Sequence, residues 1–287
     1  MPAPSVAPAA GSIASDERWV ENRPTAGHRA LDVRELWEFR ELTWFLASRD
    51  VRVRYKQAAL GLCWAILQPL AGAAVLTLVF QRFTNVASGT ASYQSFAFCG
   101  LAVWTYYSTS LNSVTASLVT NASLVTKVYF PRLAVPLSTL LPGLIDLGVA
   151  LTVLVAALLI FGQLPGIAVL TLPLWTVALV FATVGPGLLL ATLNVRYRDV
   201  HHAFGLLIQL WFFASPVAYP STLVDGAWRY VYALNPVSTV LDGFRWALLR
   251  APAPGLPAVV SAGVAAVLAW AGLRYFVAAE RRFSDII

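Results

Sequence analysis

The sequence predicts an all-α integral membrane protein: six transmembrane helices, an N-terminal amphipathic helix at the membrane interface, and two short re-entrant helices between the fifth and sixth spans. Three observations predict this fold class. Of the 287 residues, 58% are hydrophobic. Only 12% are charged, against about 25% in an average soluble domain. Several charge-free stretches reach the roughly 20 residues that cross a bilayer. These features exclude an ordinary soluble enzyme, a disordered chain and a disulfide-rich scaffold.

The charge-free stretches define the six candidate spans. The apolar stretch after Arg132 is too long for one span, and the turn signal at residues 161–166, which holds two glycines and a proline, divides it. The fifth span is short and ends in prolines, which makes it a candidate for a broken or partly re-entrant helix. The spans are expected at residues 58–80, 95–118, 133–160, 168–193, 202–219 and 254–276.

The chain begins with a segment that lacks the features of a signal peptide. Residues 1–31 are rich in Ala, Pro and Ser and contain no uninterrupted apolar core, which predicts a disordered cytoplasmic tail. Asp32 and Glu35 then resemble a capping box at the start of a helix over residues 33–47. Its aromatic side chains place this helix along the cytoplasmic leaflet, with a solvated linker helix as the alternative. A basic segment follows, and the two together make a unit at 32–57.

The distribution of Lys and Arg predicts the orientation of the spans. With both termini cytoplasmic, eleven of these side chains flank the spans on the cytoplasmic side and four on the outer side, as the positive-inside rule requires. The net charge of +6 therefore reflects topology and indicates no nucleic-acid partner. The cytoplasmic set is Arg49, Arg52, Arg54, Lys56, Lys127, Arg132, Arg196, Arg198, Arg274, Arg281 and Arg282, and the outer set is Arg82, Arg229, Arg245 and Arg250.

Residues 220–250 differ from the spans on either side of them. They hold five charged side chains among several aromatic ones. Asn235 and Pro236 divide them into two pieces that are too short and too polar to cross a membrane. We therefore expect two short helices that dip into the outer membrane face.

Motifs for catalysis are missing from the sequence. A P-loop needs a lysine that follows glycine, and neither Lys56 nor Lys127, the two lysines, does so. The acidic residues after Asp50 are scattered singly, whereas a membrane enzyme that acts on a diphosphate needs clustered acids for its metal ion. Cys63 and Cys99 lie in apolar surroundings and are read as small hydrophobic residues. The chain is therefore expected not to be an enzyme on its own, and to hold neither a metal ion nor a cofactor.

Asp146 is the one charge placed well inside a predicted span. A carboxylate at mid-membrane costs on the order of 2.5–3.5 kcal/mol, so this residue needs a reason to be there. It is either a carboxylate that lines or gates a pore, or a partner in a hydrogen bond between packed helices.

Aromatic side chains gather in and after the fifth span. Trp211, Phe212 and Phe213 lie within it, and Tyr219 lies near its outer end. Aromatic residues are common at membrane interfaces, which explains many of those in this chain. Flat rings also stack on the faces of sugars, so an aromatic-lined channel for a carbohydrate is the alternative.

Six segments between residues 33 and 280 carry motifs of a known family. They are Arg49-Asp50-Val51-Arg52-Val53-Arg54-Tyr55-Lys56-Gln57, Gly61-Leu62-Cys63-Trp64 with Gln68-Pro69, Val128-Tyr129-Phe130-Pro131-Arg132, Asn194-Val195-Arg196-Tyr197-Arg198-Asp199, Phe213-Ala214-Ser215-Pro216-Val217, and Leu234-Asn235-Pro236 with Gly243-Phe244-Arg245. In these segments the chain resembles the membrane subunits of ABC-2 type transporters that export polysaccharides. That family includes the exporters of O-antigen, capsule and teichoic acid.

The resemblance implies a multi-pass protein of the bacterial inner membrane with both termini cytoplasmic. Such a permease works as a homodimer with two copies of a separate ABC ATPase, which binds the ATP and Mg. The substrate is a lipid-linked polysaccharide that moves from the cytoplasmic face to the outer face. In this chain residues 58–280 would form the transmembrane domain, and residues 281–287 a cytoplasmic tail.

The resemblance also implies roles for particular segments. The first and fifth spans line the channel at the dimer interface, residues 120–131 couple to the ATPase, and residues 220–250 form the outer gate. The candidate channel lining is Trp64, Trp211, Phe212, Phe213 and Tyr219; the candidate coupling residues are Leu124, Lys127, Tyr129 and Phe130; the candidate gate residues are Trp228, Tyr230, Asn235, Pro236, Phe244 and Arg245.

The basic segment before the first span has two interpretations. Its cations can bind the anionic diphosphate of a lipid-linked substrate through charge-assisted hydrogen bonds. They can equally be ordinary cytoplasmic anchors that contact anionic lipids. The cations concerned are Arg49, Arg52, Arg54 and Lys56.

Other functions stay open for the chain as a whole. One alternative is an ABC-2 exporter of another amphipathic substrate, such as a lipid or a drug. A membrane-embedded glycan enzyme and a pore-forming or scaffold protein without ATP coupling belong to different classes. A neighbouring gene for an ATPase, set among glycosyltransferase genes, would favour polysaccharide export over these.

Overall fold

The computed structural model describes residues 37–56, 61, 63–83, 92–128, 130–197, 199–223, 226, 228–280 and 283. They belong to one compact unit that begins at Asp32. The expected tail at 1–31 lies outside the described residues, as does the expected tail at 281–287 apart from Phe283. All the regular structure in the described part is helical, which confirms the all-α class. The elements are α2 (Arg40–Lys56), α3 (Cys63–Phe83), α4 (Tyr93–Thr120), α5 (Ala122–Lys127), α6 (Ala134–Ser138), α7 (Leu140–Ile160), η1 (Ile167–Thr171), α8 (Leu172–Arg196), α9 (Asp199–Phe213), η2 (Ser221–Leu223), α10 (Trp228–Ala233), α11 (Pro236–Leu249) and α12 (Pro257–Ala279).

Three helical stretches of the described chain are long and apolar enough to cross a membrane. They are Ala134–Ile160, Ile167–Arg196 and Pro257–Ala279, and they coincide with the third, fourth and sixth predicted spans. Cys63–Val79, in the first predicted span, is apolar but shorter. The second and fifth predicted spans correspond to α4, whose second half is rich in hydroxyl side chains, and to α9, which has 15 residues. Several apolar helices are therefore present, and the total of six spans stays a prediction.

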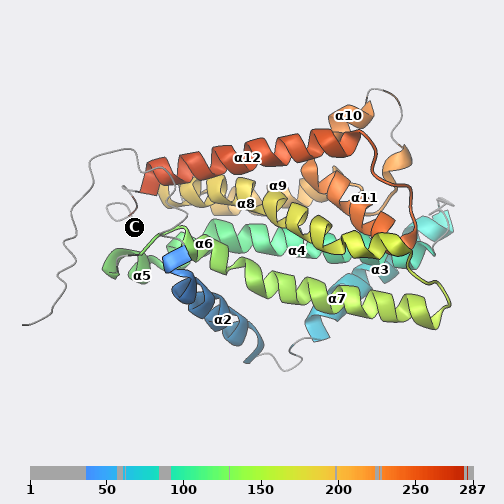
Figure 1. Ribbon diagram of the computed structural model, residues 1–287, viewed down its shortest axis with the longest axis horizontal. Coiled ribbons are helices and arrows are strands. Elements are labelled where there is room, and N and C mark those ends of the chain that lie inside the picture. Colours follow the sequence, from blue (N-terminus) through green and yellow to red (C-terminus); the bar gives the residue numbers. More distant parts are fainter. Residues whose placement is uncertain are drawn as a thin grey trace, which may run out of the picture. The chain divides into compact units, whose positions relative to one another are not determined.

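Helix α4 is the central element of the bundle. It contacts α3, α7, α8, α9 and α11, and much of its length is buried (Figure 1). Several of its hydroxyl side chains bond within the helix: Thr109 donates to the carbonyl oxygen of Thr105 at 2.6 Å, and Thr115 to that of Leu111 at 2.7 Å. Hydroxyls paired in this way can be buried without an unsatisfied donor.

Helices α8 and α12 cross where both backbones carry glycine. A Cβ atom added to Gly272 would lie 2.2 Å from the carbonyl oxygen of Gly185. Small residues at such a crossing let two membrane helices approach closely. The α8–α12 contact therefore depends on these two positions.

We expect the substitution Gly272→Ala to lower the melting temperature of the detergent-solubilised protein by several degrees. Overpacking a helix contact costs about 1–3 kcal/mol, and 1 kcal/mol shifts the melting temperature of a chain this size by about 2–4 °C. Gly263→Ala is the matched control on α12, because nothing lies within 4 Å of a Cβ added there. Equal melting temperatures for the two variants would contradict the close crossing.

The two ends of the bundle carry different short helices. Helices α2, α5 and α6 lie at one end, and α10 and α11 lie at the other (Figure 1). At the first end a buried apolar cluster joins α2, α5, α8 and α12 through Leu46, Val125, Val195 and Phe276. We call it the basal cluster, and it also contains Phe130.

Helix α2 differs from the predicted helix at 33–47. It begins at Arg40, continues through the basic segment and ends at Lys56, while residues 33–36 lie outside the described part. Arg and Lys are good helix formers, and positive charge in the last turn interacts favourably with the helix dipole. The helix buries Leu46 and Ala47 and leaves Trp44 exposed.

The region at 220–250 divides as predicted at Asn235 and Pro236. Helix α10 ends at Ala233 and α11 begins at Pro236, with the Asn235 side chain accepting a hydrogen bond from the backbone N–H of Val237 at 3.2 Å. Proline favours the first turn of a helix, and asparagine is a good N-cap. The two short helices are therefore present, and their depth in a membrane stays a prediction.

Candidate functional site

An open groove lies between the end of α9 and α10. Its volume is about 430 Å³, and its lining combines aromatic rings, aliphatic side chains and one amide. It brings together Trp211 of the candidate channel lining with Trp228 and Asn235 of the candidate gate. The groove is lined by Trp211, Ala214, Trp228, Val231, Tyr232, Leu234 and Asn235.

The indole of Trp211 is held by a closed set of hydrogen bonds. Its Nε1 donates to Oδ1 of Asn235 at 3.2 Å. Nδ2 of Asn235 donates to Oγ of Ser215 at 2.8 Å, and that hydroxyl donates to the carbonyl oxygen of Trp211 at 2.8 Å. Because Asn235 also caps α11, the ring is fixed relative to that helix. The Trp211 side chain is nevertheless 43% exposed and available to a ligand.

The other candidate lining residues do not lie in this groove. Phe212 is half-buried and packs edge-on against Trp104 of α4, with ring centres 5.5 Å apart. Phe213 and Trp64 are exposed on α9 and α3. Tyr219 donates to the carbonyl oxygen of Phe213 at 2.9 Å, and its hydroxyl also bonds to that of Tyr232.

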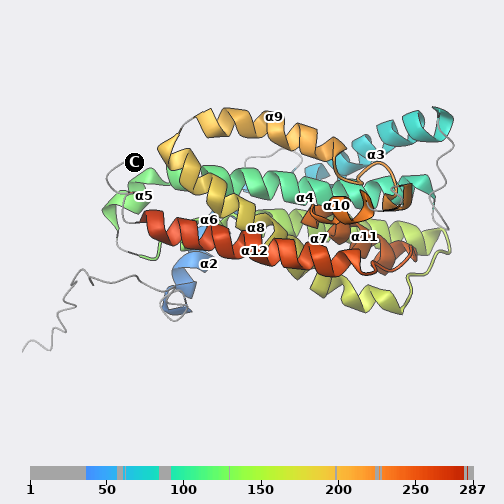
Figure 2. The same ribbon diagram turned by 90° about the horizontal axis from the view of Figure 1, so that it is seen from above.

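Helices α3 and α9 run along the same side of α4 (Figure 2). Both leave large apolar side chains uncovered there. α9 touches the bundle mainly through Phe204, Ile208 and Phe212, one residue per helical turn. The exposed side chains on these two helices are Trp64, Leu67, Leu70, Val75, Leu78, Val79, Leu206, Leu207, Leu210, Trp211 and Phe213.

Three of the candidate gate residues are interior. Pro236, Phe244 and Arg245 are buried, and only 1% of Arg245 is exposed. The Arg245 guanidinium donates to the carbonyl oxygens of Pro216 at 2.6 Å and Val217 at 2.7 Å. Arg245 therefore joins α11 to the turn after α9 and does not line the groove.

Helix α4 is shaped to accept this arginine. The guanidinium carbon lies 3.5 Å from the ring centre of Phe96, which is a cation–π contact. A Cβ atom on Gly100 would lie 2.6 Å from both Nη2 of Arg245 and the carbonyl oxygen of Val217. The sequence contains a signal for the interior role of Arg245. The proline-containing turn at 215–217 leaves backbone carbonyl groups that need a hydrogen-bond donor from elsewhere in the chain.

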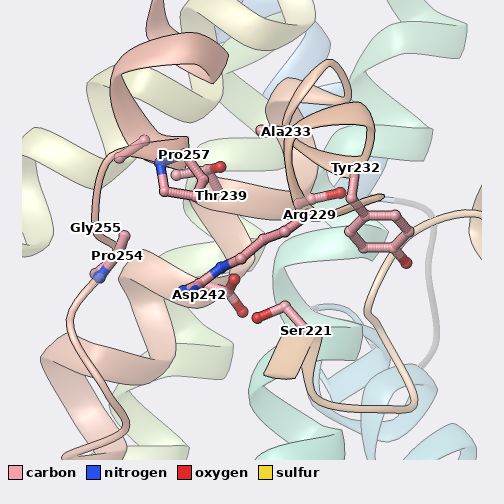
Figure 3. Close-up of a pocket in the computed structure, with 11 residues that line it drawn as sticks. Ser221, Arg229, Tyr232, Ala233, Thr239, Asp242, Pro254, Gly255 and Pro257 are labelled. Carbon is pink, nitrogen blue, oxygen red and sulfur yellow. The ribbon is translucent and has the colours of Figure 1, made fainter. Parts of the chain in front are cut away.

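A small polar cavity lies beside α10 at the same end of the bundle. Figure 3 shows Arg229 and Asp242 with their charged groups turned toward each other and Ser221 next to them. Its volume of about 30 Å³ holds no more than a water or two. The cavity therefore belongs to the packing of α10 on α11, and the groove is the larger opening.

Asp146 contacts side chains of α2, and its role stays a prediction. Its Oδ2 lies 2.6 Å from Nη2 of Arg54, and its Oδ1 accepts a hydrogen bond from the Tyr55 hydroxyl at 2.5 Å. Only 13% of the Asp146 side chain is exposed. Burial, and next this hydrogen bond, raise the pKa of Tyr55 above its usual range, so the phenol keeps the proton that it donates. The sequence did not reveal this pair, because the partners are far apart in the chain.

The four candidate head-group cations separate in the structure. Arg54 pairs with Asp146, and Arg49 pairs with Asp50 at 2.9 Å and donates to Oδ1 of Asn121 at 2.7 Å. Arg52 and Lys56 are exposed and lie four residues apart, on one face of α2. These two are the cations of the set that are open to an anionic ligand.

The candidate coupling residues lie on and after the six-residue helix α5. Lys127 is exposed, while Phe130 is buried in the basal cluster and Leu124 packs against it. Tyr129 lies outside the described residues. Thr126 and Val128, which flank Lys127, are also exposed and were missed from the sequence. The exposed residues that surround Lys127 are therefore Thr126 and Val128, and Ser123 is exposed earlier on α5.

Comparison with known proteins identifies the family. The family model described as ABC-2 type transporter matches residues 41–249. The chain is 30% identical over 258 residues to the O-antigen export system permease protein RfbA of Myxococcus xanthus, covering 89% of this chain and 98% of that protein. Two proteins of the same description from Klebsiella pneumoniae are 27% identical over 201 residues, covering 70% of this chain and 77% of theirs. The match spans the bundle from α2 to α11, which contains both the groove and the coupling segment. This chain therefore belongs to the family of ABC-2 type transporters.

Proposed function

We propose that this chain is the channel-forming subunit of an ATP-driven exporter, which moves a lipid-linked polysaccharide from the cytoplasmic to the outer face of a bacterial inner membrane. The relatives named above are O-antigen export permeases, and their names supply the substrate class. Two copies of the chain work with two copies of a separate ABC ATPase. The chain itself transmits movement and carries out no chemical step.

The observation that carries this proposal is the groove between α9 and α10. Its two indoles, Trp211 and Trp228, offer apolar faces to sugar rings, and Asn235 places an amide beside them. Binding sites of this kind combine aromatic walls with a few polar groups that orient the ligand. The groove opens beside the uncovered faces of α3 and α9, where a second copy of the chain would complete a channel.

The end of the bundle with α2 is the cytoplasmic end in this proposal. Arg52 and Lys56 meet the diphosphate of the lipid carrier there, because their exposed charges can form charge-assisted hydrogen bonds with it. The exposed Trp44 and Phe45 rest in the head-group region. Thr126 to Val128 contact the ATPase.

The experiment that tests this function is export in cells that produce the chain together with a candidate ABC ATPase from the same organism. Cells that lack the chain should accumulate lipid-linked glycan inside, and the wild-type chain should restore glycan at the surface and co-purify with the ATPase. We expect Lys127→Glu to weaken co-purification about tenfold, since one buried ionic contact at an interface is worth at least that much. The amount of glycan at the cell surface should fall together with the co-purification of the ATPase.

Arg250→Glu is the matched control for this charge reversal. Arg250 is exposed at the α10–α11 end of the bundle, away from α5. Its variant should bind the ATPase as the wild type does. A wild-type chain that neither binds an ATPase nor affects surface glycan would refute the proposed function. Lys127→Glu with normal ATPase binding would remove Lys127 from the coupling contact.

A further inference from the structure

Helix α2 is attached to two separate parts of the protein by polar contacts. The first attachment is at the junction of α4 and α5. Nη2 of Arg49 donates to Oδ1 of Asn121 at 2.7 Å, and Asn121 is both the C-cap of α4 and the N-cap residue of α5. Leu46 strengthens this attachment, because it lies in the basal cluster with Val125 of α5. A displacement of α5 therefore acts directly on α2.

The second attachment is on α7. Each carboxylate oxygen of Asp146 has its own donor on α2: Arg54 at 2.6 Å and Tyr55 at 2.5 Å. A charge-assisted pair with a second hydrogen bond is among the stronger polar contacts in proteins, and removing one partner leaves the other charge unpaired. This attachment lies more than one helical turn beyond Arg49 along α2.

The two attachments differ in how firmly the rest of the protein holds them. On either side of Asp146 the helix α7 is long and apolar, and Leu147, Ala150 and Leu154 are buried in the main core. Helix α5 has only six residues, and much of its surface is exposed. The α7 attachment is therefore the more firmly held of the two, and the α5 attachment is the less firmly held.

The end of α2 leads directly to the first channel helix. α2 ends at Lys56 and α3 begins at Cys63, so a short connection joins the two. Helix α2 is packed against α6 and α7. A rotation of α2 about its attachment to α7 would therefore displace the start of α3.

We propose that α2 is a rigid lever between the coupling segment and α3, and that Asp146 is its pivot, acting as a positioning residue through Arg54 and Tyr55. This inference rests on the proposed function, since it assumes that α5 receives movement from an ATPase. It explains why a carboxylate is placed within the bundle. Losing the pivot leaves the ATPase attached and active while its movement no longer reaches α3.

The test measures glycan exported per ATP hydrolysed by the complete complex of the chain with its ATPase in membrane vesicles. Asp146→Asn keeps the side-chain shape and removes the charge. We expect it to lower this ratio by about tenfold, within the range of coupling between two protein sites, while ATP hydrolysis and the yield of complex stay near wild type. Arg54→Gln should have the same effect, and Tyr55→Phe, which leaves the ion pair, a smaller effect in the same direction.

The exchanged pair Arg54→Asp with Asp146→Arg should restore most of the ratio, because the attraction between α2 and α7 returns. Arg40→Gln is the control, since it removes the same charge from an exposed position at the start of α2. It should leave the ratio unchanged. These two variants separate the pivot contact from the net charge of the helix.

Two results would overturn the inference. One is a wild-type ratio for both Asp146→Asn and Tyr55→Phe. The other is a loss of complex, hydrolysis and export in equal proportion, which would make Asp146 a packing residue only. If the wild-type complex itself neither hydrolyses ATP nor exports glycan, the proposed function is what fails.

Discussion

Replacing Trp211 by alanine should lower the rate of glycan export by tenfold or more. The indole forms one wall of the groove, and its Nε1 hydrogen bond to Asn235 holds it in a single orientation. Truncating a fixed aromatic side chain at a binding site typically costs 2 kcal/mol or more, roughly a factor of thirty. Export of radiolabelled glycan into inverted vesicles measures the effect.

Two further variants identify what the indole contributes. Trp211→Phe keeps an aromatic face and loses the hydrogen bond to Asn235. Its export rate should therefore lie between that of the Trp211→Ala variant and that of the wild type. Trp270→Ala is the control, because Trp270 is exposed on α12 and does not line the groove. If Trp211→Ala and Trp270→Ala reduced export and complex yield alike, the groove would have no special part in transport.

Replacing Arg245 by alanine should destabilise the fold more than any of the other substitutions considered above. Two buried carbonyl groups, those of Pro216 and Val217, would lose their donors, and a cavity would open beside Phe96. Each unpaired buried group costs about 1–3 kcal/mol, so the loss is about 2–6 kcal/mol before any cavity term. Thermal unfolding in detergent, followed by intrinsic fluorescence, measures this loss.

The matched control is Arg250→Ala at the end of the same helix. Arg250 is exposed, and its replacement should change stability by less than about 0.5 kcal/mol. Arg245→Lys should be intermediate, because an ammonium group can serve one carbonyl but cannot span both as the planar guanidinium does. Equal stability for Arg245→Ala and the wild type would show that the turn at 215–218 does not depend on Arg245.

The local signals in the sequence predicted the order of the helices well. The turn at residues 161–166 lies between helices in the structure, and the break predicted at Asn235 and Pro236 separates α10, which ends at Ala233, from α11, which begins at Pro236. Helix breaks depend on local sequence, because Pro lacks a backbone N–H and Gly allows unusual backbone angles. They can therefore be predicted without knowledge of tertiary contacts. The end of α2 was placed too early, since the basic segment shows no apolar pattern of its own and joins the bundle through Arg49, Arg54 and Tyr55.

The sequence predicted candidate site residues, but only some of them lie together in the structure. Trp211, Trp228 and Asn235 line one groove, and their roles in lining and closing a channel stay predictions. Phe244 and Arg245 belonged to the same sequence motif, yet they are buried. A motif records which residues occur together along the chain, and the packing of the helix decides which of them face inward.

By itself, the sequence determined that this is an all-helical, apolar protein, the order of its main helices, and the family to which it belongs. Those properties follow from composition, charge spacing and local motifs, and none of them requires knowledge of contacts between distant residues. Only the tertiary structure decided which cations are paired and which are exposed, that Asp146 meets Arg54 and Tyr55, and that Arg245 is interior. These are contacts between helices distant in the chain. They depend on how the helices rotate about their axes and pack, and nearest neighbours in the sequence do not specify that.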